Sequence, residues 1–279
     1  MNAPSTERVQ ALLRLLSDPD EQIARTIQEE LVKMGRPILP FLETAQTEHP
    51  SLVPRLAYVL GEILFPQLLE AFSQGIRQST LGWEEGAFLI AQLGYPTLNS
   101  RPYRHTLDQF AEEFRSQWNL ELISVEEMAR HLAMFLFKDK GFSGNQERYY
   151  DPDNSFMNRV MDRRQGIPIT LSALYVFVGK RLGLPVAGVG MPGHFLVRIE
   201  GVTPPLFVDA FNGGAFRKEQ DCRQFIEAAG LDFHPRYLEK SSTSAILSRM
   251  LRNLLGIYEE TRQETMARRV KVLLDSFDV

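Results

Sequence analysis

A change in the residue pattern near position 169 limits the folds that this sequence can adopt. Residues Ile169–Leu182 are almost uniformly apolar and end at Gly183, which indicates a buried helix. Three short runs rich in β-branched and aromatic residues follow, at Val186–Val189, Phe195–Ile199 and Leu206–Asp209. This order predicts an α+β core in which a central helix packs on a small antiparallel sheet. It excludes a doubly wound fold, and no Gly-rich nucleotide loop is present.

The N-terminal part of the sequence has helical patterns. The first clear helix is expected to take its cap from Ser17 or Asp18 and to end at Gly35. A second is predicted over residues 38–45, and a third over 50–63.

Two of these helices have similar sequence patterns, which indicates an internal repeat. Leu31 and Leu60 lie twenty-nine residues apart, each near the end of an amphipathic helix. Such a period is typical of stacked helical pairs, so the segment resembles HEAT-like repeats, with an ordinary helical bundle as the alternative. Apolar residues near the C-terminus also keep a helical period and predict an antiparallel helix pair. We therefore expect a helical HEAT-like segment 1–80, a core 81–240 and a C-terminal helical hairpin 241–279.

Composition excludes several classes of function. The net charge is −4 and no run of Lys or Arg exceeds two residues, so we expect no nucleic acid partner. No uninterrupted apolar run approaches the ~20 residues of a membrane span, and no signal-peptide pattern opens the sequence. We therefore expect a cytoplasmic protein without a membrane role. A single cysteine, Cys222, and scattered histidines predict neither a metal nor a cofactor.

The core also has part of an acyl-transfer pattern. A thiol nucleophile works best at a helix N-terminus, with a histidine as base and a carboxylate that orients the imidazole. His194 and Asp209 supply the last two groups. If the strands around them form a hairpin centred near Gly201–Val202, residue i pairs with residue 403 − i, and His194 faces Asp209. Directly opposed Cβ atoms lie about 4.5–5.5 Å apart, which allows an imidazole–carboxylate bond.

Four motifs in order carry a family resemblance: Asn154-Ser155, Arg164–Ser172, Pro192–Val197 and Val208–Gly214. From about residue 84 to about residue 255, the protein resembles the SirB-type branch of the transglutaminase-like superfamily. The resemblance implies a papain/transglutaminase-like core and a bacterial source. Members often continue into tetratricopeptide-like helices, of which this protein would keep one hairpin. A similar domain occurs in an F-box protein of animals.

The resemblance also implies where a nucleophile should lie. Transglutaminases and their bacterial protease relatives carry a cysteine two residues after the glycine that opens the central helix. Counting forward from Gly166, and back from Gly183, gives Pro168 at that position. Proline suits the first turn of a helix but cannot attack a carbonyl. The resemblance therefore implies a base role for His194, an orienting role for Asp209 and a lost nucleophile.

Other nucleophiles are possible in principle. Thr170 and Ser172 lie one half-turn and one full turn along the helix, but a hydroxyl needs a stronger base than a thiol, and such residues commonly cap helices or bond to the backbone. Cys222 follows Asp209, contrary to the order in the family, and is expected to be a small buried hydrophobe. The His194–Asp209 pair also has a purely structural interpretation, since a buried imidazole needs a partner.

Several neighbours are candidates for lining a binding cleft. Tyr150 and Asn154 precede a helix predicted over 156–161, and Asn154 either faces the cleft or caps that helix. Phe195 and Asn212 flank the histidine and the aspartate. Arg163 and Arg164 either bind an acidic group or form salt bridges at a helix end.

Two hypotheses follow. The first, and favoured, is a transglutaminase-fold pseudoenzyme whose cleft binds a peptide or protein segment. The alternative is a hydrolase or acyl-transferase that uses Thr170 or Ser172 with His194 and Asp209.

Overall fold

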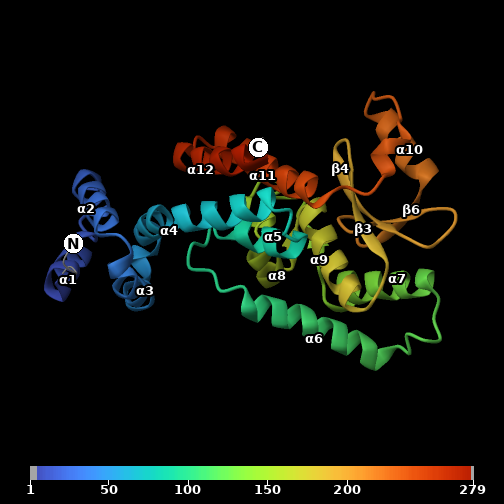
Figure 1. Ribbon diagram of the computed structural model, residues 1–279, viewed down its shortest axis with the longest axis horizontal. Helices are drawn as coiled ribbons and strands as arrows, with labels where there is room; N and C mark the ends of the chain where they lie inside the picture. The colour runs from blue at the N-terminus through green and yellow to red at the C-terminus, as the bar shows by residue number, and fades with distance from the viewer. Residues whose placement is uncertain (1–4, 278–279) are drawn as a thin grey trace.

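The computed structural model describes residues 5–277 and places the N-terminal helices at one end of the molecule and the main sheet at the other (Figure 1). The first helices are α1 (Thr6–Leu15), α2 (Glu21–Met34), α3 (Leu39–Glu48) and α4 (Val53–Arg77). They share an N-terminal apolar cluster that runs from Val9 to Ile63 and contains both Leu31 and Leu60. The HEAT-like character of this segment stays a prediction.

The predicted cap of α2 is wrong. The side chain of Asp20, directly before the helix, accepts a hydrogen bond from the amide of Gln22 at 2.8 Å. Asp18 instead accepts the amide of Asp20 at 2.9 Å, in the turn that precedes the helix. The cap therefore falls to the carboxylate that lies within reach of the first helical turn.

Helix α4 is longer than predicted and joins two apolar clusters. It continues through Pro66 to Arg77, with Ile63 in the N-terminal cluster and Phe72 in the main cluster of the protein. Uninterrupted apolar runs did not indicate a membrane span, because charged residues such as Glu62 divide them. By length and composition alone, however, the helical stretch Pro50–Arg77 could cross a membrane, and 33 % of its most apolar window is buried within the protein.

The central part of the protein surrounds one buried helix. Its helices are α5 (Trp83–Ala91), α6 (Arg101–Gln117), α7 (Val125–Met134), a π-helical turn (Phe135–Asp139), α8 (Met157–Arg163) and α9 (Pro168–Arg181). Residues of α9 are buried from Pro168 to Gly179, and the helix packs on two strands of the main sheet. The predicted α+β class is confirmed.

The main sheet is antiparallel and has the order β3-β4-β5-β6. Its strands are β3 (Val186–Met191), β4 (His194–Ile199), β5 (Leu206–Asp209) and β6 (Ala215–Lys218). One face carries Val197 and Val208 into the main cluster, whereas Leu196 and Phe207 on the other face pack with Cys222 of α10 (Glu219–Ala228). A second, parallel pair, β1 (Ser143–Gly144) and β2 (Gln165–Gly166), lies at the start of α9.

The predicted register of the central hairpin is wrong by two residues. Val197 pairs with Val208, and Ile199 with Leu206, so paired residue numbers sum to 405 instead of 403. The loop between the strands is therefore centred later in the sequence than Gly201–Val202. A shift of two residues preserves which side chains share a face, because the side-chain period of a strand is two.

Two helices complete the fold and pack beside α4 and α5, namely α11 (Thr243–Glu260) and α12 (Glu264–Leu274) (Figure 1). Arg269 of α12 is 5 % exposed and donates to Glu62 of α4 at 2.8 Å. Its guanidinium occupies the space beside Gly61, where any Cβ would collide with it. The absence of a side chain at Gly61 therefore lets Arg269 pack against α4 and hold α12 in place.

Candidate functional site

Helix α9 begins at Pro168, the position at which the family resemblance implies a thiol in related enzymes. Pro168 is buried at the first helical position, where a proline leaves no amide unpaired and its φ suits the helix. Beside it, Oγ1 of Thr170 accepts a hydrogen bond from the amide of Ile167 at 3.1 Å and donates one to the carbonyl oxygen of Asn154 at 2.8 Å. The helix start is therefore closed by its own hydrogen bonds.

Strands β4 and β5 bring His194 and Asp209 together. Nε2 of His194 lies 2.8 Å from Oδ1 of Asp209, and the two residues are 8 % and 3 % exposed. Asn212, in the turn after β5, donates its side-chain amide to Oδ2 of Asp209 at 2.8 Å and its main-chain N–H to Oδ1 at 3.3 Å. The interaction of Asn212 shows that it orients the carboxylate.

The carboxylate of Asp209 is held ionised. Burial by itself raises the pKa of Asp209, but the hydrogen bond and charge of His194, together with two bonds from Asn212, outweigh burial and lower it. In the neutral form of His194, an imidazole that donates from Nε2 to this carboxylate keeps Nδ1 as its acceptor. No hydrogen bond to Nδ1 occurs within residues 5–277, so that nitrogen is the one available to a ligand.

The candidate nucleophiles are buried and engaged elsewhere. The hydroxyl of Ser172 is fully buried and lies 3.5 Å from the carbonyl oxygen of Phe195. The hydroxyl of Thr170, also fully buried, holds the start of α9. Cys222 lies on the face of the sheet that packs on α10, and burial raises its pKa to about 12. The prediction that Cys222 is a small buried residue is confirmed.

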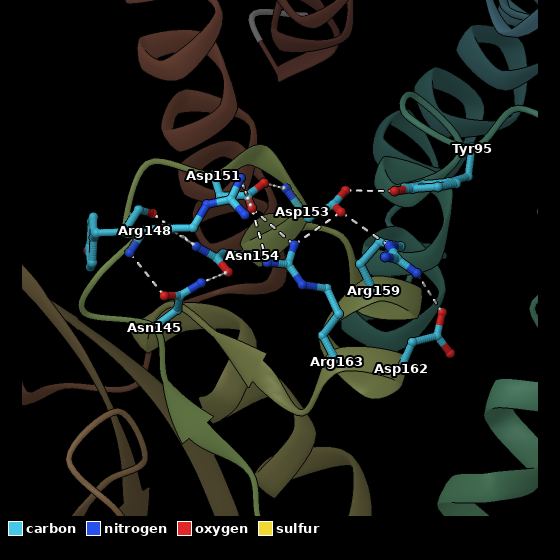
Figure 2. Close-up of polar contacts among 10 residues, drawn as sticks. Tyr95, Asn145, Arg148, Asp151, Asp153, Asn154, Arg159, Asp162 and Arg163 are labelled. Atoms are coloured by element: carbon cyan, nitrogen blue, oxygen red, sulfur yellow. Dashed lines mark hydrogen bonds and ion pairs between the residues drawn. The ribbon is translucent and has the colours of Figure 1, made fainter. Parts of the chain in front are cut away.

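The loop 145–155 forms one border of the site, and ion pairs fix it to α8 (Figure 2). Arg163 donates to both Asp151 and Asp153 at 3.1 Å, and Arg159 pairs with Asp153 at 3.2 Å. The hydroxyl of Tyr95 donates to Asp153 at 2.6 Å. Arg163 therefore forms salt bridges, as one of the two sequence interpretations expected.

Asn154 holds the same loop from within and does not line a cleft. Its side-chain amide donates to the carbonyl oxygens of Arg148 and Tyr149 at 2.7 and 3.2 Å, and its Oδ1 accepts from Asn145 at 3.0 Å (Figure 2). Asn154 is completely buried, so it neither faces a ligand nor caps α8. Both interpretations of Asn154 were wrong because the loop turns back upon this residue.

An aromatic rim, made of Tyr149, Tyr150, Phe211 and Phe225, begins at the ring of His194 and continues to the 145–155 loop. The ring centroids of Phe225 and Phe211 lie 5.6 and 6.3 Å from that of His194. Tyr149 packs edge-to-face on Phe211 at 5.8 Å, and Tyr150 on Tyr149 at 5.3 Å. Tyr150 is 67 % exposed and Phe225 is 46 % exposed, so the rim offers apolar surface to a partner.

Phe195, a predicted cleft residue, is not part of this rim. It is 1 % exposed, and its ring packs edge-to-face on that of Trp83 at 5.8 Å. Its place after His194 in a strand turns its side chain to the opposite face, into the core. The sequence patterns did not predict that Phe225 and Tyr149 belong to this rim. They also did not predict strand β6. Phe211 lies within the Val208–Gly214 motif, and its position two residues after Asp209 was the sequence feature that could have placed it near His194.

The site offers no metal ligand set. Across residues 5–277, no group of three or more His, Cys, Asp or Glu side chains is arranged to hold a metal ion. What the arrangement provides is an oriented imidazole, an ionised carboxylate beside it and an exposed aromatic border.

A buried helix packed on an antiparallel sheet that holds a His–Asp pair defines a papain/transglutaminase-type core. Residues 101–252 match the sequence model of the Transglutaminase-like superfamily, and the protein belongs to that superfamily. It is similar to a UPF0162 protein of Xylella fastidiosa (strain 9a5c), with 34 % identity over 206 residues that cover 70 % of this sequence and 71 % of that protein. No solved structure matches it significantly.

Similarity extends to an animal protein over a smaller share of its length. F-box only protein 21 of Mus musculus is 33 % identical over 152 residues, which cover 52 % of this sequence and 23 % of the mouse protein. A UPF0162 protein of Vibrio cholerae is 29 % identical over 157 residues, 54 % of this sequence and 58 % of that protein.

Proposed function

We propose that this protein is a transglutaminase-fold pseudoenzyme that binds a peptide or protein segment against His194 and the aromatic rim. The observation that carries the proposal is the start of α9. Pro168 stands where the thiol belongs, and the nearest hydroxyl, on Thr170, is buried and bonded to Asn154 and Ile167. An oriented base without a nucleophile supports recognition more than acyl transfer.

The surface beside the base supports the same function. Exposed aromatic side chains are common anchors in protein interfaces, because they bury a large apolar area at a small cost in side-chain entropy. Phe225, which packs on His194, and Tyr150, which packs on Tyr149, offer such exposed anchors. The similarity to an F-box only protein supports a role in protein interaction.

The proposal has finer parts that rest on the sequence patterns. It includes the SirB-type branch, HEAT-like repeats in 1–80, a core over 81–240 and a tetratricopeptide-like hairpin in 241–279. It also includes a cytoplasmic location, with neither a membrane nor a nucleic acid as partner.

A peptide array tests the binding function. Wild-type protein is incubated with an array of random peptides, and bound sequences are compared with those bound by Tyr150→Ser and Phe225→Ser. We expect each substitution to weaken binding about tenfold or more, as for an interface anchor. Tyr58→Ser, which removes an aromatic residue 39 % exposed on α4, is the matched control and should bind like the wild type. Equal binding by all four proteins, or by none, contradicts the proposal.

An activity-based probe tests the alternative. A fluorophosphonate labels a serine or threonine hydroxyl only where a base activates it. We expect no labelling of the wild type at Thr170 or Ser172. Labelling at either residue that disappears in His194→Ala would overturn the pseudoenzyme proposal.

A further inference from the structure

Arg249 differs from the other buried arginines of this protein. Within residues 5–277, every other arginine that is partly or fully buried has a carboxylate oxygen within 4.0 Å, namely Arg55, Arg104, Arg159, Arg163, Arg181, Arg198, Arg217 and Arg269. Arg249 is partly buried and has no such partner. A partly buried cation without a counter-ion is unfavourable, since desolvation is not offset by an ion pair.

The position of Arg249 joins it to the candidate site. From α11, its Nη2 donates to the carbonyl oxygen of His194 at 2.9 Å and its Nη1 donates to that of Met191 at 2.8 Å. The guanidinium lies 5.6 Å from the centre of the Phe195 ring. It therefore supports the turn between β3 and β4 that carries His194.

The charge of Arg249 also acts on Tyr149 of the 145–155 loop. Burial raises the pKa of Tyr149, and the positive charge of Arg249 partly offsets that rise. Tyr149 in turn packs on Phe211, which packs on His194. The lone cation thus bonds to the turn that carries His194, and the rings of Tyr149 and Phe211 connect that turn to the 145–155 loop.

The guanidinium keeps donors for a further acceptor. An arginine carries five N–H groups, and two of those of Arg249 are used on main-chain carbonyl groups, which leaves three. Neutral carbonyls satisfy hydrogen bonds but do not neutralise the charge. A carboxylate would do both, and the planar guanidinium matches its geometry.

We propose that the segment bound beside His194 presents a carboxylate and that Arg249 receives it. This inference rests on the proposed binding function and names the chemistry of the ligand. The carboxylate belongs either to the C-terminus of a polypeptide or to the side group of an Asp or Glu residue. Both would place an anion against Arg249 with an aromatic or apolar neighbour against the rim.

Small probes separate these sources without knowledge of the natural ligand. N-acetylphenylalanine carries a C-terminal carboxylate, and acetyl-Phe-Glu-amide carries the carboxylate of a glutamate. N-acetylphenylalanine amide and acetyl-Phe-Gln-amide are their neutral counterparts. Each is titrated into full-length protein while the Nε–H resonance of Arg249 is followed by NMR, with the signal assigned by its loss in Arg249→Lys.

The expected result is a saturable shift of the Arg249 signal with at least one acid, and binding at least about tenfold weaker with its neutral counterpart, as for hydrogen bonds to charged groups. The acid that shifts the signal identifies the source. Arg252→Gln, which removes an exposed arginine from the same helix, should respond like the wild type. No shift with either acid, or equal affinity for acid and neutral probes, overturns the inference. Peptide-array binding that persists in that case leaves the proposed function standing.

Discussion

Nε2 of His194 and Oδ1 of Asp209 lie 2.8 Å apart although the two residues are not directly paired in the sheet. If the observed pairing of β4 with β5 is continued by one more pair, Asp209 lies opposite Leu196. Asp209 therefore reaches His194 diagonally across the two strands. Diagonal neighbours on one face remain within reach of long side chains. The contact therefore depends on which face the residues share. A one-residue slip would separate them, whereas the two-residue shift from the predicted register does not.

The Asp209 carboxylate makes stability depend on pH at the acidic end. Its pKa in the folded protein lies below the ordinary value of 3.8, so its ionised form stabilises the fold. This contribution is complete above pH 3.8 and is lost as pH falls through the lower, folded pKa. Asp209→Asn should unfold at lower urea concentration than the wild type at neutral pH, and the difference should shrink through that acidic window.

The matched control is Asp232→Asn, an exposed aspartate, whose urea midpoint should follow that of the wild type. A gap between Asp209→Asn and wild type that stays constant with pH would contradict the assignment.

Placing a thiol at the start of α9 tests the proposal that Pro168 occupies a nucleophile position. In a Cys222→Ala background, Pro168→Cys places a thiol at the first position of α9, where the helix dipole favours the thiolate. We expect labelling by a small methanethiosulfonate reagent at a rate that falls when His194→Ala is added. The loss of proline should lower the free energy of unfolding by less than ~1 kcal/mol. Equal labelling rates with and without His194 would show that the imidazole does not serve this position.

The ion pairs of the 145–155 loop should stabilise it measurably. Asp153→Ala removes the shared partner of Tyr95, Arg159 and Arg163 and leaves two guanidinium groups less compensated. We expect a loss of about 2 kcal/mol in the free energy of unfolding and faster hydrogen exchange across the loop. Glu227→Ala, which breaks an exposed pair with Arg223, should cost less than ~0.5 kcal/mol. Similar losses in both variants would refute this role for Asp153.

Two helical glycines should respond in opposite directions to alanine. A Cβ at Gly61 collides with the guanidinium of Arg269, so Gly61→Ala should lower the free energy of unfolding by about 1–3 kcal/mol. A Cβ at Gly256 meets nothing within 4 Å, so Gly256→Ala should raise it by about 0.5–1 kcal/mol. Urea denaturation of both variants measures the difference between their free energies of unfolding. Equal free energies would show that the Arg269 contact does not hold α12 in place.

Local sequence patterns predicted the central helix and the first three strands of the main sheet. They did not predict contacts between residues that are far apart in the sequence. The apolar run of α9 and the β-branched strands follow from periodicity within a few residues. Strand β6 has no such signal, since Ala-Phe-Arg-Lys lies at a sheet edge with no fully buried residue. Arg249 lies 55 residues from His194, so no spacing within a motif points to their contact. Asn154 was misjudged for the same reason, because its partners depend on how the loop closes.

The contact between Glu62 and Arg269 also has a consequence for synthesis of the protein. The two residues are 207 positions apart, so Arg269 is translated long after Glu62. While the polypeptide emerges, the N-terminal helices can pack among themselves, but the space beside Gly61 stays unfilled until α12 has been translated. A truncated product that lacks α12 would therefore leave the space beside Gly61 unfilled and Glu62 without its buried cation.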